Sequence, residues 1–211
     1  QKSLENLGAR VMQYHSWLGH LEAVTIACAQ KEVRNADILG FLHDDILIHE
    51  DGWDTRVLAE FNGPNVAVVG FGGGLTQGHP DIYKIPYELS QLGRSYYLSN
   101  DDYAENHGYR FTGSCDAAVL DSHSMFIRRE FLDSLGGWPQ DFPPNHCLDH
   151  WISLSAHKNG KKVRIVGVKT LHKGGQTTVA NRDYHAWTQI TEWGSDVVMH
   201  KQAHRKIYDR S

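Results

Sequence analysis

The sequence predicts an α/β fold with an open sheet, and three observations support this class. Apolar runs short enough to be buried strands occupy residues 36–42, 66–69 and 163–168. Apolar residues recur at three- and four-residue spacings, the period of a helix, in residues 16–34 and 148–155. Polar residues directly follow several of the strands, and open α/β sheets build their ligand sites at the carboxyl ends of strands.

The amino-terminal half should alternate helices and strands. We expect a helix over about residues 16–34, followed by the strand that ends at His43. A second helix begins near Trp53 and ends at residues 62–64, where Asn, Gly and Pro break the pattern. The next strand runs into the glycine-rich residues 70–74. These glycines either let a ligand approach the backbone or serve a turn, because their spacing matches neither a dinucleotide fingerprint nor a phosphate loop.

The carboxyl-terminal half begins with a Tyr-rich, poorly periodic stretch, residues 76–114, which predicts an insertion loop. Tyrosine rings suit the faces of sugars, although packing against the domain is the commoner use of this side chain. Residues 117–127 read as one strand, or as two strands joined by a bend. A short helix then starts at Arg128. Residues 183–208 predict a closing helix, so we expect residues 1–211 to form a single domain.

Composition narrows the class of protein. With 211 residues, 40% hydrophobic and 22% charged, the chain can bury the core of one sizeable domain. The 21 basic and 25 acidic side chains give a net charge of −4, which argues against nucleic acid as a partner. The cysteines are few and widely separated, which indicates a reducing compartment. No apolar run approaches the roughly 18 residues of a transmembrane segment. We therefore expect a cytoplasmic protein, with a peripheral position on a membrane as the alternative.

An acidic pair, Asp44 and Asp45, follows His43 at the end of the first strand. Adjacent carboxylates repel each other and are costly to desolvate, so they need a cation, basic partners or good solvation. A solvated polar turn is one explanation, because Asp is a good turn former. However, residues 46–48 are apolar again and no Gly or Pro marks a turn, which favours a divalent cation at the pair.

Three later polar residues are further candidates for a site. Asp121 lies within apolar sequence, so it is either paired or close to a site. Asp149 falls at the amino end of a helix, where it serves either as a cap or as a general base. His172 comes just after a strand, as His43 does. A lone His in this place is more often structural, but the repeated placement strengthens the case for metal binding.

Four segments in this order resemble the family 2 glycosyltransferases of the GT-A fold. They are the aspartate-rich motif at residues 43–45, the Arg-Arg to Gly-Gly-Trp segment at 128–138, the helix opened by Asp149, and the His-Lys-Gly-Gly segment at 172–175. The likeness spans roughly residues 33–178. It implies a Rossmann-like mixed sheet flanked by helices, with the amino-terminal nucleotide-binding region only partly present. It also implies transfer of a sugar from a nucleotide-diphosphate donor, such as a uridine diphosphate sugar, to a glycan or other hydroxyl acceptor.

The resemblance assigns roles to individual residues. It implies that Asp45, together with Asp44, meets a Mn²⁺ or Mg²⁺ ion bound to the diphosphate of the donor. His172 is similar to the late metal ligand of the family. Asp149 matches the acidic residue that acts as general base on the acceptor hydroxyl, and a single base of this kind implies inversion at the anomeric carbon.

Two further residues are assigned to the donor by the same resemblance. Trp151 lies where a donor or acceptor sugar could stack, and Asp121 lies near the segment that borders the donor sugar.

The sequence departs from the family at His43, where an acidic residue is common. Two other functions stay open: a catalytically silent module that binds sugars or nucleotide sugars, and a metal-dependent phosphoesterase, which would generally need more ligands to hold two metals.

Overall fold

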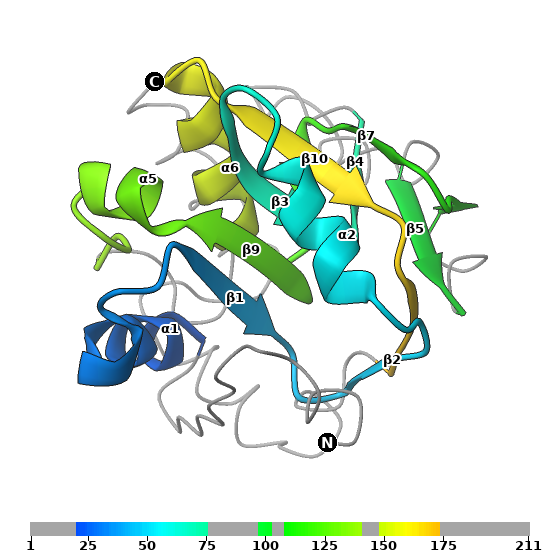
Figure 1. Ribbon diagram of the computed structural model, residues 1–211, viewed down its shortest axis with the longest axis horizontal. Helices are drawn as coiled ribbons and strands as arrows, with labels where there is room; N and C mark the ends of the chain where they lie inside the picture. The colour runs from blue at the N-terminus through cyan, green and yellow to red at the C-terminus, as the bar shows by residue number, and fades with distance from the viewer. Residues whose placement is uncertain (1–19, 76–96, 103–107, 141–147, 174–211) are drawn as a thin grey trace, which may run out of the picture.

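The computed structural model describes residues 20–75, 97–102, 108–140 and 148–173 (Figure 1). The helices are α1 (His20–Ala29), the short 3-10 helix η1 (Lys31–Val33), α2 (Trp53–Glu60), α5 (Arg129–Ser134) and α6 (Leu148–Lys158). The strands are β1 (Ile38–Leu42), β2 (Ile46–Ile48), β3 (Val66–Gly70), β4 (Gly72–Gly74), β5 (Tyr97–Asp101), β6 (Tyr109–Arg110), β7 (Ser114–Asp116), β8 (Val119–Leu120), β9 (Ser124–Arg128), β10 (Lys162–Val166) and β11 (Lys169–His172).

The central element is a five-stranded sheet in the order β1-β9-β3-β10-β7. Strands β3 and β10 are parallel, and the other neighbouring pairs are antiparallel. The ladder between β1 and β9 pairs Leu42 with Ser124. It continues one residue further, because the backbone N–H of His43 donates to the carbonyl of His123 at 3.0 Å. The end of β1 is therefore fixed beside the turn that precedes β9.

A second sheet lies at the carboxyl end of β1. Its strands follow the order β2-β11-β5-β4-β8, and β6 also pairs with β5. Pairing is again mixed, because β11 is parallel to β5 and antiparallel to β2. The β2–β11 register places Ile46 opposite His172. The residue before Ile46 is Asp45, so this ladder brings an early carboxylate beside a late imidazole.

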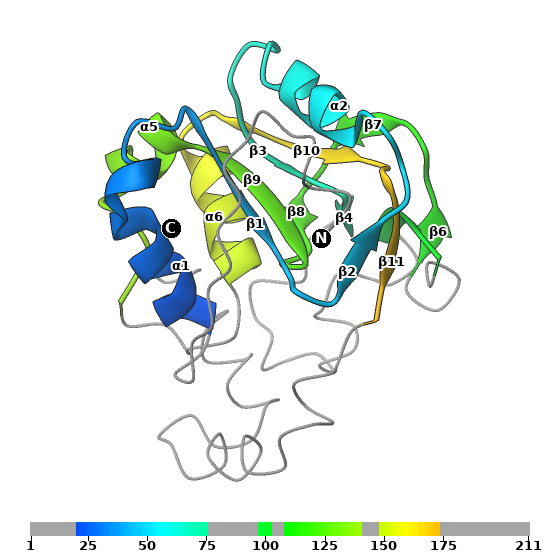
Figure 2. The same cartoon turned by 60° about the horizontal axis from the view of Figure 1, so that its bottom comes forward.

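Helices cover both faces of the five-stranded sheet. Helix α2 lies over one face, and α1, α5 and α6 lie on the other (Figure 2). Side chains alternate along β9 because successive residues of a strand point to opposite faces. Phe126 joins the buried cluster under α2, whereas Met125 and Ile127 join the cluster under α6. Burying one aliphatic side chain completely stabilises the folded state by about 1.5–3 kcal/mol relative to leaving it exposed. The two clusters therefore hold the sheet between its helices.

The predicted fold class is confirmed: the chain is α/β, with mixed sheets flanked by helices. Residues 117–127 form two strands, β8 and β9. Helix α1 ends earlier than expected, at Ala29, because η1 replaces its last turn. Residues 16–19 of the expected helix lie outside the described residues. The glycines of residues 72–74 form strand β4 rather than a loop. A side chain at Gly73 would collide with the Val119 carbonyl, so close strand packing explains this glycine without a ligand.

The expected Tyr-rich loop and closing helix are described only in part or not at all. Within residues 76–114, strands β5, β6 and the first residue of β7 are formed, and residues 76–96 and 103–107 lie outside the described part. The helix predicted for residues 183–208 also lies outside it. Among the residues that the structure describes, no helix is long and apolar enough to cross a membrane.

Candidate metal centre and neighbouring carboxylates

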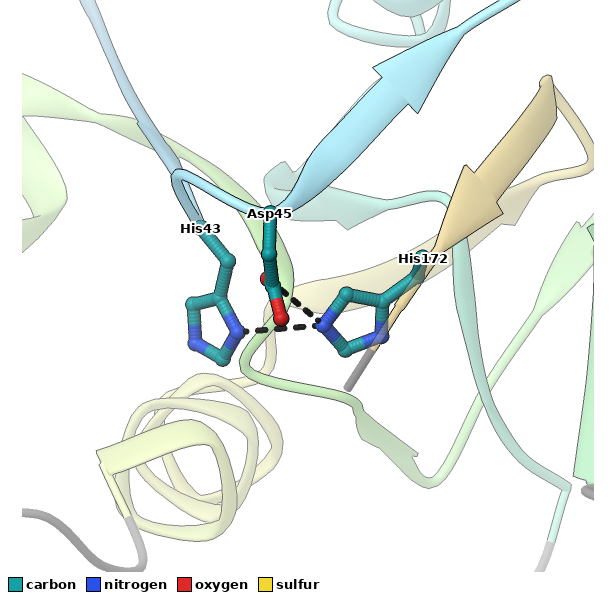
Figure 3. Close-up of side chains that lie close together, drawn as sticks. All are labelled: His43, Asp45 and His172. Atoms are coloured by element: carbon teal, nitrogen blue, oxygen red, sulfur yellow. Dashed lines mark hydrogen bonds and ion pairs between the residues drawn. The ribbon is translucent and has the colours of Figure 1, made fainter. Parts of the chain in front are cut away.

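Three potential metal ligands meet where the two sheets join. His43 and Asp45 lie on the turn between β1 and β2, and His172 ends β11 (Figure 3). From this turn the side chains of His43 and Asp45 both point toward His172 (Figure 3). The backbone N–H of Lys173 donates to the Asp45 carbonyl at 3.2 Å, extending the β2–β11 ladder to the level of the ligands.

The facing atoms of these three side chains lie close together. His43 Nδ1 is 3.4 Å from His172 Nε2, and His172 Nε2 is 3.2 Å from Asp45 Oδ1. One ligand atom from each residue lies within 4.8 Å of the other two. No other group of His, Cys, Asp and Glu in the described parts of the chain meets this condition. The predicted proximity of Asp45 and His172 is therefore observed, and His43 joins them.

Burial keeps both imidazoles of this group neutral near pH 7. Burial, together with the nearby His20, His123 and His172, lowers the pKa of His43 to about 4. Burial also lowers the pKa of His172, an effect that the Asp45 carboxylate opposes only in part. A neutral imidazole has the lone pair that a metal ion requires, whereas an imidazolium does not.

Asp101 and His123 hold the His172 side of the group in place. The buried Asp101 carboxylate accepts hydrogen bonds from Thr170 Oγ1 at 2.9 Å and from the backbone N–H of His172 at 2.7 Å. The His123 ring stacks on the His172 ring, with centroids 5.0 Å apart. These contacts fix the backbone and the ring plane of His172.

Asp121 was expected to be either paired or close to a site, and in the structure it is paired. Its carboxylate accepts a hydrogen bond from Tyr97 Oη at 2.8 Å and lies 3.1 Å from His123 Nδ1. Burial alone would raise the pKa of Asp121, but the His123 imidazole and Tyr97 outweigh burial and lower it. The Asp121 carboxylate raises the pKa of His123 for the same reason, against the effect of burial. An ion pair thus lies directly behind His172.

Asp149 is neither an unpaired carboxylate nor a simple helix cap. It lies in the first turn of α6, and its Oδ1 accepts hydrogen bonds from the backbone N–H of His150 at 2.8 Å and from His150 Nδ1 at 2.9 Å. Its Oδ2 accepts a hydrogen bond from the backbone N–H of Ser122 at 3.1 Å, which ties α6 to the turn before β9. Burial would raise the pKa of Asp149, but His150 outweighs burial and lowers it, so the group is ionised at neutral pH.

The remaining two predicted site residues do not belong to the metal group. Asp44 is exposed and does not belong to the group of three ligands. Trp151 is partly buried and packs against the core beneath α6, with its ring 5.7 Å from that of Trp138. Packing accounts for the described contacts of Trp151, and its assignment to a sugar stays a prediction.

Sequence reasoning did not assign His43, His123, Asp101 or Tyr97 to the site. His43 follows a strand, as His172 does, and this placement was a usable signal. His123 offered no such signal, because it lies on the turn between β8 and β9. Asp101 and Tyr97 offered no local signal, because β5 was not predicted and its contact with β11 depends on sheet pairing.

Comparison with known proteins does not assign this chain to a family. No family model and no curated protein matches the sequence. The fold resembles that of a mannosyltransferase, PcManGT from Pyrobaculum calidifontis, solved in complex with GDP-Man and Mn²⁺, with 15% identity and a TM-score of 0.42 over 91% of this chain. It also resembles A197 from STIV, with 17% identity and a TM-score of 0.39 over 70% of this chain. The chain spans 53% and 61% of these two proteins, respectively, and such distant likeness assigns no activity.

Proposed function

We propose that this chain is a metal-dependent glycosyltransferase that moves a sugar from a nucleotide-diphosphate donor to a hydroxyl acceptor, with inversion. The convergence of Asp45 and His172 supports this function, because segments far apart in the sequence meet with their ligand atoms 3.2 Å apart. Carboxylate oxygen and imidazole nitrogen are both common ligands of divalent ions. The pair fits the Mn²⁺ or Mg²⁺ ion that such a reaction uses to neutralise the departing diphosphate.

Asp149 is the proposed general base. A carboxylate offers about four lone-pair sites, and among the described residues the three hydrogen bonds from His150 and Ser122 leave one of them on Oδ2. An acceptor hydroxyl could bind at this position and lose its proton as it attacks the sugar. The hydrogen bond to Ser122 N also fixes Asp149 beside Asp121, which carries the ion pair behind His172.

The remaining assignments concern the donor and the extent of the domain. Asp44, Asp121 and Trp151 are proposed to contact the nucleotide sugar, with a uridine diphosphate sugar as the first donor to test. We propose that residues 1–211 belong to one GT-A-like domain. The acceptor is a glycan or another molecule that presents a hydroxyl group.

A thermal-shift screen of nucleotide sugars, each with and without Mn²⁺, tests donor binding. We expect one donor to raise the melting temperature in a metal-dependent way. That donor is then incubated with a panel of hydroxyl acceptors, and NMR of the anomeric proton reports transfer and configuration. Metal-dependent donor binding without transfer would indicate a silent binding module, and release of inorganic phosphate from simple phosphoesters would indicate a phosphoesterase. Either result contradicts the proposed function.

A further inference from the structure

We propose that His43, Asp45 and His172 form a resident transition-metal site, which binds its ion in the absence of any nucleotide sugar and discriminates against Mg²⁺. Two imidazole nitrogens and one carboxylate oxygen make up this site. The inference deepens the metal requirement of the proposed function. It concerns binding of the ion alone, and can therefore be tested separately from sugar transfer.

Two of the three separations between the ligand atoms match a coordination sphere, and the third is within 4.8 Å. Metal–ligand bonds of about 2.1 Å place neighbouring ligand atoms about 3.0 Å apart in an octahedron and about 3.4 Å apart in a tetrahedron. The observed separations are 3.4 Å between His43 Nδ1 and His172 Nε2, and 3.2 Å between His172 Nε2 and Asp45 Oδ1. An ion can therefore reach these atoms with only small movements of the three side chains.

The alternative is a hydrogen-bonded cluster without an ion. In that arrangement His172 Nε2 would carry a proton and share it between the Asp45 carboxylate and His43 Nδ1. Only one N–H would then serve two acceptors, and His43 Nδ1 would be left with a partner at 3.4 Å, beyond the usual length of an N–H···N bond. A metal ion satisfies all three lone pairs at once.

The chemistry of the ligands determines which ion binds. Imidazole favours zinc, cobalt, nickel and other later transition metals, whereas Mg²⁺ and Ca²⁺ prefer oxygen ligands. With two nitrogens among three protein ligands, affinity should rise from Mn²⁺ to Co²⁺ and Zn²⁺, and Mg²⁺ should bind much more weakly than any of them. His43 is responsible for this selectivity, because it supplies the second nitrogen.

The surrounding contacts explain why no donor is required. Asp101 holds the backbone of His172, the carbonyl of His123 holds the backbone of His43, and Lys173 N holds that of Asp45. All three ligands are thus positioned by the protein before an ion arrives. Three protein ligands with further positions open for water or substrate are the usual arrangement of a catalytic transition-metal centre.

The test is a titration of the metal-free full chain, prepared without an affinity tag, with CoCl₂, MnCl₂ and MgCl₂. Calorimetry gives the affinities, and the visible absorption of bound Co²⁺ reports nitrogen ligands. We expect one Co²⁺ per chain, bound at least about 100-fold more tightly than Mg²⁺ with no nucleotide present. His43→Ala should weaken Co²⁺ binding at least about tenfold, whereas His49→Ala, at an exposed histidine near the end of β2, should leave it unchanged.

His43→Asp provides the decisive variant, because it keeps three ligands and replaces nitrogen by oxygen. Its ratio of Co²⁺ to Mg²⁺ affinity should fall at least about tenfold. Circular dichroism of each variant distinguishes loss of a ligand from loss of the fold. Three results would overturn the inference. They are equal affinities for Co²⁺ and Mg²⁺, no metal binding without a nucleotide sugar, and an unchanged ratio of Co²⁺ to Mg²⁺ affinity in His43→Asp. A chain that binds Co²⁺ as expected but transfers no sugar would contradict the proposed function alone.

Discussion

At the scale of single residues, Asp149 shows how a buried carboxylate can remain available for chemistry. Three of its lone-pair sites are occupied by His150 and Ser122, and within the part of the chain that the structure describes the fourth is left on Oδ2. The hydrogen bonds hold the group rigidly at the start of α6 and keep it ionised. A low pKa makes it a weaker base than one poised near neutrality, so fixed placement against the acceptor must provide much of its effect.

Asp149→Asn tests this role. We expect kcat to fall by about 10²- to 10⁴-fold, because an amide cannot take the proton of the acceptor hydroxyl. Metal binding should be unchanged, since Asp149 is not one of the three ligands. The matched control is Asp133→Asn, which removes an exposed carboxylate of α5 that contacts Arg129. Turnover of Asp149→Asn at the rate of the control would refute the assignment.

The neighbouring residues Asp44 and Asp45 should behave differently from each other. Asp45→Asn is expected to weaken Co²⁺ or Mn²⁺ binding more than tenfold, because it removes the only anionic ligand of the group. Asp44→Asn should leave metal affinity within about twofold and weaken only the binding of the donor, because Asp44 is exposed and outside the group. Calorimetry with metal alone, then with donor and metal, separates the two effects. Similar metal affinities of the two variants would contradict this division.

The sequence predicted part of the site at this scale. Asp45 and His172 could be identified because each follows a strand, and Asp149 because it opens a helix. The resemblance does not assign a role to His43, because the family commonly has an acidic residue at that position. Asp101 and His123 act through contacts with His172 that exist only after distant strands have paired.

At the scale of elements, the adjacent residues Arg128 and Arg129 join the helices to β9. Arg128 donates to the carbonyls of Phe61, at the end of α2, and of Val66, at the start of β3. Arg129 donates to the Val33 carbonyl at 2.9 Å and to the Cys28 carbonyl at 3.3 Å, near the end of α1. The Arg-Arg segment that contributed to the family resemblance therefore has a structural role in this chain.

Arg129→Met should destabilise the fold without changing the site. We expect the free energy of unfolding to fall by about 2 kcal/mol, because charged hydrogen bonds to two carbonyls are lost. Urea denaturation measures this change, and metal affinity should stay the same. Arg110→Met is the control, since that guanidinium lies on the surface and 3.7 Å from Asp102. A loss of stability no greater than in the control would show that Arg129 does not anchor α1.

Element boundaries were less predictable than element types. Residues 117–127 divide into β8 and β9 because the Asp121 carboxylate accepts a hydrogen bond from His123 N and forms a turn. The glycines of residues 72–74 were expected either to approach a ligand or to serve a turn, yet they form a strand between β5 and β8. Both outcomes depend on neighbours that are distant in sequence, which local patterns cannot encode.

At the scale of the whole molecule, the sequence predicted the α/β class, and the structure distributes the mixed pairing over two sheets. Short apolar runs and helical periods suffice to predict layers of strands and helices. They do not reveal that the chain leaves one sheet after β1 and enters the other at β2. The turn at residues 43–45 makes that change, and it also holds two of the three proposed ligands.

The proposed ion should stabilise the entire fold. Saturation at 100 times the dissociation constant adds about 2.7 kcal/mol to the free energy of unfolding. For a domain of this size, each kcal/mol raises the melting temperature by about 2–4 °C, so Co²⁺ should raise it by about 5–10 °C relative to protein in EDTA. Calorimetric melting curves measure the shift. A double variant, Asp45→Ala with His172→Ala, should show no such difference, and an equal shift in that variant would place the ion elsewhere.

The junction between β2 and β11 has a further consequence for how the chain opens. His43 and His172 are 129 positions apart, so an ion that binds both closes a long loop and restricts the partly unfolded chain. The Lys173 N–H, which donates to Asp45 at this junction, should then exchange with deuterated water more slowly once the ion is bound. Amides of α2 that exchange by local opening rather than by global unfolding should exchange at the same rate with and without the ion, because α2 contributes none of the three ligands.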